Sequence, residues 1–224
     1  MSEVVKTIHT HGPTRLGTEL AVLHQAGIVG LLVPRGYELD SESIRIEYPT
    51  EFVSLKKIFD ANNVTLGPDA YLNDPSFVRT CVFLYGIGDV NVRNAKGDGL
   101  LVDEWGVPCY GERHLGNMSW DGKRVMYFDF ESAFAHRLWM VKRRMVLQGF
   151  LEIIPEMSSV CDGFRSAVRT IFNEKKKEIK EEALCLPDHI DFGVDQGWFL
   201  SGAQAAAMNN VFDARLSFLE ESCK

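Results

Sequence analysis

The amino-acid sequence predicts an α+β fold in two lobes, a small strand-rich lobe over residues 1–52 and a mostly helical lobe over residues 53–224. Apolar and polar residues alternate over residues 44–48, as in a half-buried strand. Helical spacing of apolar residues prevails after residue 132. Between these parts, residues 109–133 carry a polar strand-turn-strand pattern. This order favours a lobe with a sheet followed by a helical lobe.

The chain opens with a predicted strand and a predicted helix. Residues 4–8 are short and rich in β-branched side chains, which is typical of a strand. Thr14 is placed to cap the helix that follows, and Gly27 is placed to end it. The apolar face of this helix comprises Leu16, Leu20 and Leu23.

Two further runs in the first lobe predict an antiparallel pair. The apolar run at residues 28–33 stops at Pro34, and the alternating run at residues 44–48 follows it. The turn-forming residues Asp40-Ser41 lie between the two runs. We therefore expect residues 28–33 to pair with residues 44–48.

The second lobe is predicted to be mainly helical. Residues 53–60 suggest a short amphipathic turn or two, and Asp74-Pro75 opens a helix that carries Phe77, Cys81 and Leu84. Residues 86–106 have no clear period, because Gly97 and Gly99 interrupt it. Three later helices are predicted at residues 132–150, 158–183 and 203–220.

Composition narrows the class of protein. The net charge of −7 and the isoelectric point near 5.4 argue against a broad nucleic-acid or anionic-membrane surface. The five cysteines are scattered without a Cys-x-x-Cys pair, which favours reduced thiols over disulfides or zinc. We find no signal peptide and no apolar run of membrane-spanning length. These features predict a cytoplasmic protein that binds neither nucleic acid nor membrane.

The polar hairpin carries the candidate chemistry. Asp121-Gly122 between alternating runs is a strong hairpin signal, and folding there brings Asn117 and Asp129 to one end of the ribbon. An amide oxygen and a carboxylate suit Mg²⁺, which prefers oxygen ligands. Glu112 lies in the loop that enters the hairpin, where it could accept a proton from a hydroxyl.

These residues resemble the catalytic loop of the kinase-like phosphotransferases. Residues 110–117 read Tyr-Gly-Glu-Arg-His-Leu-Gly-Asn, similar to the His-Gly-Asp-x-His-x-Gly-Asn of the small-molecule branch. Residues 129–131 read Asp-Phe-Glu, similar to the metal-binding motif of choline-kinase-like and aminoglycoside-phosphotransferase-like enzymes. Asn117 follows Glu112 by five residues and Asp129 follows it by seventeen, which fits the family.

The resemblance extends, more weakly, over about residues 4–135 and implies a two-lobed, protein-kinase-like fold that binds ATP and Mg²⁺. It implies that Lys6 contacts the phosphates, that Glu19 holds Lys6, and that Glu47 and Tyr48 border the adenine. Asn117 and Asp129 would hold the metal, and Glu112 would act as the base. The acceptor would be a hydroxyl of a small molecule or of a protein.

Two departures from the family open an alternative. The expected catalytic residue is Glu112 in place of aspartate, and no glycine-rich loop precedes Lys6 in this sequence, so either the first lobe is reduced or the sequence is short at its start. A longer side chain moves the carboxylate, and well-placed acid–base catalysis contributes roughly 10² to 10⁴ in rate. The alternative is a pseudokinase, weak or inactive in catalysis, that binds a partner protein.

Other residues repeat parts of the same pattern. Residues 86–94 offer a second Asp-to-Asn spacing of five, with Asp103 beyond it, but the gap is short for two strands and a turn. Residues 188–193 resemble a lipid-kinase metal motif, yet the segment before them is helical and charged, which favours a plain turn. His114 suits a structural role in its loop, and His9 and His11 are most simply surface residues.

Overall fold

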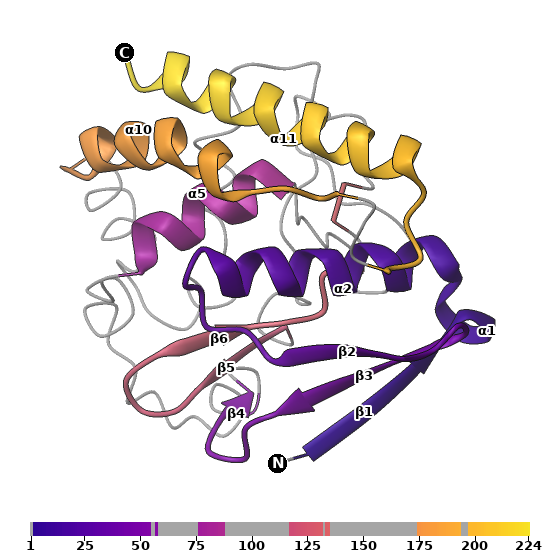
Figure 1. The fold of residues 1–224 in the computed structure, drawn as a ribbon. Coiled ribbons are helices and arrows are strands. Elements are labelled where there is room, and N and C mark those ends of the chain that lie inside the picture. The colour runs from indigo at the N-terminus through magenta and orange to yellow at the C-terminus, as the bar shows by residue number, and fades with distance from the viewer. Residues whose placement is uncertain are drawn as a thin grey trace, which may run out of the picture.

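The computed structural model describes residues 2–54, 57, 76–87, 117–131, 133–134, 174–193 and 197–224. Over these residues the protein is an α+β structure, as the sequence predicted, with two small antiparallel sheets and several helices (Figure 1). The helices named below pack into a single core with the first sheet. Predictions for residues 58–75, 88–116 and 135–173, including the helix start at Asp74-Pro75, lie outside the described residues.

The first sheet has the order β1-β3-β2, with β1 at Ser2–Thr7, β2 at Arg35–Asp40 and β3 at Ser43–Tyr48. Strand β3 is central, and its Ile44 and Ile46 are fully buried because their side chains share the face that is covered by a helix. Lys6 of β1 stands directly opposite Ile44. Its side chain therefore lies on the same, covered face.

That helix is α2, at Pro13–Ile28, which follows the short α1 at Ile8–His11. Pro13 occupies the first turn, where a missing N–H costs nothing, and Gly12 at φ 80° precedes it. Thr14 was predicted as the cap, but the helix already begins at Pro13, so Gly12 holds that position. Buried residues occur on every side of α2 between Leu16 and Ala26, because structure covers the helix all round.

Figure 1 shows α2 between the first sheet and a layer of α5, α10 and α11. Gly36 of β2 permits the close approach to the sheet, since a Cβ there would lie 3.0 Å from side-chain atoms of Leu20 and Leu23. The first sheet thus packs closely against one face of α2.

The predicted strand at residues 28–33 was wrong. Helix α2 continues through Gly27 to Ile28, and the paired strand is β2, which begins after Pro34. The apolar residues Val29 and Leu31 enter the core at the helix end, where the Leu31 N–H donates to the Ala26 carbonyl. The run at residues 28–33 is therefore apolar because Val29 and Leu31 are buried at the end of α2, and not because the run forms a strand.

The second sheet contains the predicted hairpin, with β5 at Met118–Trp120 and β6 at Val125–Tyr127. Asp121 accepts hydrogen bonds from the N–H groups of Lys123 and Arg124, and Gly122 adopts φ 98°. Strand β4, at Val53–Ser54, pairs with β5, where the sequence suggested helix. The hairpin prediction is confirmed, and the start of the helical stretch at residue 53 is corrected.

The helical layer consists of α5 at Phe77–Ile87, α10 at Lys176–Cys185 with the 3₁₀ turn η2 at Leu186–His189, and α11 at Gly202–Ser222. Aromatic rings of Phe83, Phe192 and Phe212 link the layer, with centroids 6.0 to 6.3 Å apart. A reciprocal capping box of Ser201 and Gln204 begins α11. The predicted helix at residues 203–220 is confirmed. Of the helices in the described parts of the chain, none has the length and apolar character needed to cross a membrane.

Candidate functional site

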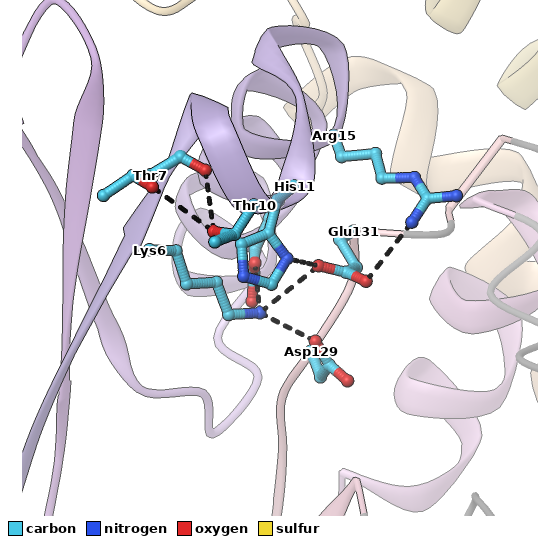
Figure 2. A network of polar contacts seen from close by, with 8 residues as sticks. Lys6, Thr7, Thr10, His11, Arg15, Asp129 and Glu131 are labelled. Carbon is cyan, nitrogen blue, oxygen red and sulfur yellow. Dashed lines mark hydrogen bonds and ion pairs between the residues drawn. The ribbon is translucent and has the colours of Figure 1, made fainter.

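The candidate site is an ion cluster around the ammonium group of Lys6. Lys6 Nζ donates hydrogen bonds to Glu19 Oε2 at 2.7 Å and to Asp129 Oδ1 at 2.8 Å. Glu131 Oε2 lies 3.7 Å from the same nitrogen. Figure 2 shows the side chains of Lys6, Asp129 and Glu131 converging. Residues separated by more than one hundred positions thus meet at one point.

Lys6 and Glu19 are held in place by the packing of α2 on the first sheet. Lys6 is 9% exposed and Glu19 is fully buried. The covered face of β1 directs Lys6 towards α2, and Glu19 on α2 meets it. A buried charge is tolerated when an opposite charge and hydrogen bonds compensate it, so each of the two residues depends on the other.

Asp129 reaches the cluster from the end of the hairpin. Its φ of 67° lies in the left-handed region, which few residues other than glycine adopt. Among the other residues, aspartate and asparagine tolerate this region best. The Phe128 N–H donates to the Asn117 carbonyl at 3.1 Å, and the fully buried Phe130 anchors the next position. Backbone strain of this kind gathers at functional sites. The neighbours of Asp129 therefore fix an uncommon conformation that directs its carboxylate to Lys6.

Glu131 joins the cluster to the start of α2. Its carboxylate accepts a hydrogen bond from His11 Nδ1 at 2.8 Å, and Arg15 Nη1 lies 3.8 Å from its other oxygen (Figure 2). His11 is partly buried, whereas the side chain of Arg15 is 57% exposed. The loop after β6 is thereby tied to α1 and α2 through side chains.

Burial and charge act in opposite directions on Lys6 and Glu19. Burial favours the neutral amine of Lys6, but the attraction of Glu19 and of Asp129 outweighs it, so the pKa of Lys6 lies above its usual value. Burial raises the pKa of Glu19 to about 7, and Lys6 opposes this rise while Asp129 and Glu131 add to it. Glu19 is therefore a carboxyl group that changes its charge near neutral pH.

Tyr48 lies beside the cluster, whereas the side chain of Glu47 does not. The ring of Tyr48 contacts Phe128 edge to face at 5.4 Å, and burial, followed by the charge of Glu19, raises the pKa of its hydroxyl. Residues of a strand alternate between faces, so Glu47 and Arg45 lie on the face opposite Ile46 and Tyr48. Glu47 pairs there with Arg45 at 3.5 Å.

Three carboxylates of the cluster could hold a metal ion. Glu19, Asp129 and Glu131 each offer an oxygen, and these oxygens lie within 4.8 Å of one another. Oε1 of Glu19 is buried without a hydrogen-bond partner in the described part of the chain. Carboxylate oxygens are hard ligands that suit Mg²⁺, Mn²⁺ or Ca²⁺.

The structure brings together several residues that the sequence singled out. Lys6, Glu19 and Asp129 are in direct contact, Tyr48 lies close by, and Asn117 shares the hairpin end with Asp129. Glu112, the expected base, lies outside the described residues.

Sequence reasoning missed Glu131 and His11 as members of the cluster. Glu131 was part of the Asp-Phe-Glu motif but had no role, and His11 was expected at the surface. The available signal for Glu131 was its position two residues after Asp129, in the same Asp-Phe-Glu motif. His11 gave no comparable signal, because its partner is 120 positions away.

Comparison with known proteins found no match to this chain among protein-family models, curated sequences or solved structures.

Proposed function

We propose that this protein is an ATP- and Mg²⁺-dependent phosphotransferase with a protein-kinase-like, two-lobed fold. The observation that carries the proposal is the position of Lys6, whose ammonium contacts Glu19 of α2 and Asp129 of the loop after β6. A strand, a helix and a hairpin, distant in sequence, each supply one charged group to one point.

This arrangement supports phosphotransfer because the same three residue types do defined work in kinase-like enzymes. A strand lysine contacts the nucleotide phosphates, a helix glutamate holds that lysine, and an aspartate after a hairpin binds Mg²⁺. Lys6, Glu19 and Asp129 have the corresponding element types and contacts. A nucleotide bound here would replace Asp129 with phosphate oxygens as a partner of Lys6.

The donor set also suits the metal that the proposal requires. The unpartnered Oε1 of Glu19 and the excess of carboxylates over ammonium groups indicate a place for positive charge. Asn117 and Asp129 would hold Mg²⁺, which would neutralise charge on the phosphates. Tyr48 would border the adenine with its ring, and Glu47 would contribute only its backbone, since its side chain lies on the other face of the sheet.

The reaction would transfer the γ-phosphoryl group of ATP to a hydroxyl of a small molecule or a protein. The bond between the γ-phosphorus and the bridging oxygen breaks, the acceptor oxygen bonds to phosphorus, and Glu112 takes the acceptor's proton. Positioning and charge stabilisation supply most of the rate in this class, and Lys6 held by Glu19 supplies part of both.

Calorimetric titration with ATP tests the proposal. We expect ATP to bind in the presence of Mg²⁺ and to bind at least tenfold more weakly to Asp129→Asn. Asparagine is the right replacement because it tolerates the left-handed backbone of Asp129 and removes only the charge. Asp213→Asn, on the exposed face of α11, is the matched control and should bind like the wild type. Absence of ATP binding with and without Mg²⁺ would refute the proposal.

The glutamate at position 112 favours a second candidate, a nucleotide-binding pseudokinase that engages a protein partner. This candidate shares the ATP binding but lacks turnover. Release of ADP, followed with a coupled assay in the presence of candidate hydroxyl acceptors, separates the two functions.

A further inference from the structure

The charges of the Lys6 cluster do not balance. Three carboxylates, from Glu19, Asp129 and Glu131, surround the single ammonium of Lys6. Arg15 adds positive charge to Glu131, but it lies 3.8 Å away and is 57% exposed, so water screens most of its effect. His11 donates a hydrogen bond to Glu131 without needing to carry a charge. With all three carboxyl groups ionised, the cluster therefore retains an excess of negative charge in a largely buried place.

One oxygen of the cluster lacks a partner. Glu19 is fully buried, and while its Oε2 receives the hydrogen bond from Lys6, its Oε1 receives none from any described residue. A buried carboxylate oxygen without a donor costs free energy, because it has lost its contact with water and gained no partner in return. This oxygen can be satisfied by a ligand that carries positive charge.

The spacing of the three carboxylates fits one ion. Their oxygens lie within 4.8 Å of one another. Two oxygens on opposite sides of a Ca²⁺ ion are about 4.6–5.2 Å apart, and on opposite sides of Mg²⁺ about 4.0–4.2 Å apart, from the usual metal–oxygen distances. The three carboxylates are therefore close enough together to bind one divalent cation.

We propose that Glu19, Asp129 and Glu131 form a divalent-cation site that is occupied without any nucleotide. The cation binds beside Lys6 and, with Glu19 ionised, brings the summed charge of these four side chains and the ion to zero. The inference goes beyond the proposed function, which needs a nucleotide and assigns no role to Glu131. It also gives Glu19 a second partner, so that cation and lysine together hold α2 against the hairpin.

Titration of the full chain with Mn²⁺, in the absence of nucleotide, tests the site by the loss of the free-ion electron paramagnetic resonance signal. We expect saturable binding by one Mn²⁺ and competition by Ca²⁺. Glu131→Gln should weaken binding at least tenfold, because one charged ligand is lost. Glu221→Gln, an exposed residue near the end of α11, is the matched control and should bind like the wild type.

A variant that is expected to strengthen Mn²⁺ binding distinguishes the loss of a metal ligand from misfolding. Lys6→Met removes the competing positive charge, so it should tighten Mn²⁺ binding severalfold, which an unfolded chain cannot do. Circular dichroism of each metal-free variant establishes that it is folded. Equal binding by Glu131→Gln and wild type, or no saturable Mn²⁺ binding by the wild type, would overturn the inference. If Mn²⁺ binds but ATP does not, the cation site stands and the proposed function falls. If ATP binds with Mg²⁺ while Mn²⁺ alone does not, the reverse holds.

Discussion

The carboxyl group of Glu19 can be satisfied by a proton or by the ammonium of Lys6. Full burial penalises its charge, and the ion pair at 2.7 Å only partly offsets this penalty, which leaves its pKa at about 7. The structure thus contains a glutamate whose charge is sensitive to small changes around it.

Stability should therefore depend on pH through Glu19. Its folded pKa of about 7 exceeds the ordinary value of 4.5, so between these two pH values the folded state binds more protons than the unfolded state. The stabilising contribution of Glu19 is complete below pH 4.5 and is lost as the pH rises through about 7. Glu19→Gln resembles the neutral acid and should not lose it.

Urea denaturation of wild type and Glu19→Gln between about pH 5 and about pH 8 measures this effect. The free energy of unfolding of the variant relative to wild type should increase over this range, by roughly 3 kcal/mol at most. A difference that is independent of pH would show that Glu19 has an ordinary pKa.

At the residue scale, the sequence could predict the members of the cluster that belong to motifs. Lys6, Glu19 and Asp129 were identified because their order along the chain matches the order of the functional residues in the family that the sequence resembles. Glu131 gained its significance only from the distance between its carboxylate and two other carboxylates, and His11 from a contact across 120 positions. Such contacts depend on how the helices and strands pack against one another, and a local sequence pattern carries no information about that packing.

Elements bounded by turn chemistry were predicted well, and elements bounded by burial were not. The hairpin was identified because Asp121-Gly122 determines its own turn through local hydrogen bonds. The apolar run after α2 was misassigned because residues in a core beneath a helix end have the same composition as a buried strand. A short apolar run does not distinguish the two.

The packing of α5 on α11 gives a test at the scale of elements. A Cβ at Gly86 would lie 2.4 Å from the ring of Phe212, which is buried against Phe83 and Phe192 and cannot move aside. Gly86→Ala should gain about 1 kcal/mol in helix propensity but lose more through the clash. We expect a net loss of about 1–2 kcal/mol in chemical denaturation.

Gly27→Ala is the control for this substitution, because it is also a helical glycine and has nothing within 4 Å of the added Cβ. It should be neutral or slightly stabilising. A loss at Gly27 equal to that at Gly86 would mean that the clash with Phe212 is not the cause.

At the scale of the whole molecule, residues 190–193 and 197–200, which lie between η2 and α11, pack against α2. The Gln25 side chain donates to the Asp191 carbonyl and accepts from the Asp191 N–H. The ring of Trp198 contacts His24, and a Cβ at Gly17 would lie 3.1 Å from Phe199. Helix α2, which carries Glu19, is therefore held on one side by the first sheet and on another by the C-terminal part of the chain.

Gln25→Met tests this contact, since methionine has a similar size but makes neither hydrogen bond. Two backbone groups of Asp191 would lose their partner, and we expect a loss of about 1–3 kcal/mol in the free energy of unfolding. The Asp191 amide should also exchange its hydrogen faster with solvent. Unchanged stability together with unchanged exchange would show that the pair does not hold α2.

The enclosure of α2 has a consequence for biosynthesis. Gln25 leaves the ribosome 166 residues before its partner Asp191, so a helix that is mostly buried in the folded protein must wait for part of its cover while those residues are made. Proteins dominated by contacts between residues far apart in sequence fold slowly and expose hydrophobic surface while they fold. The nascent chain is therefore expected to be a client of chaperones until its last segment emerges.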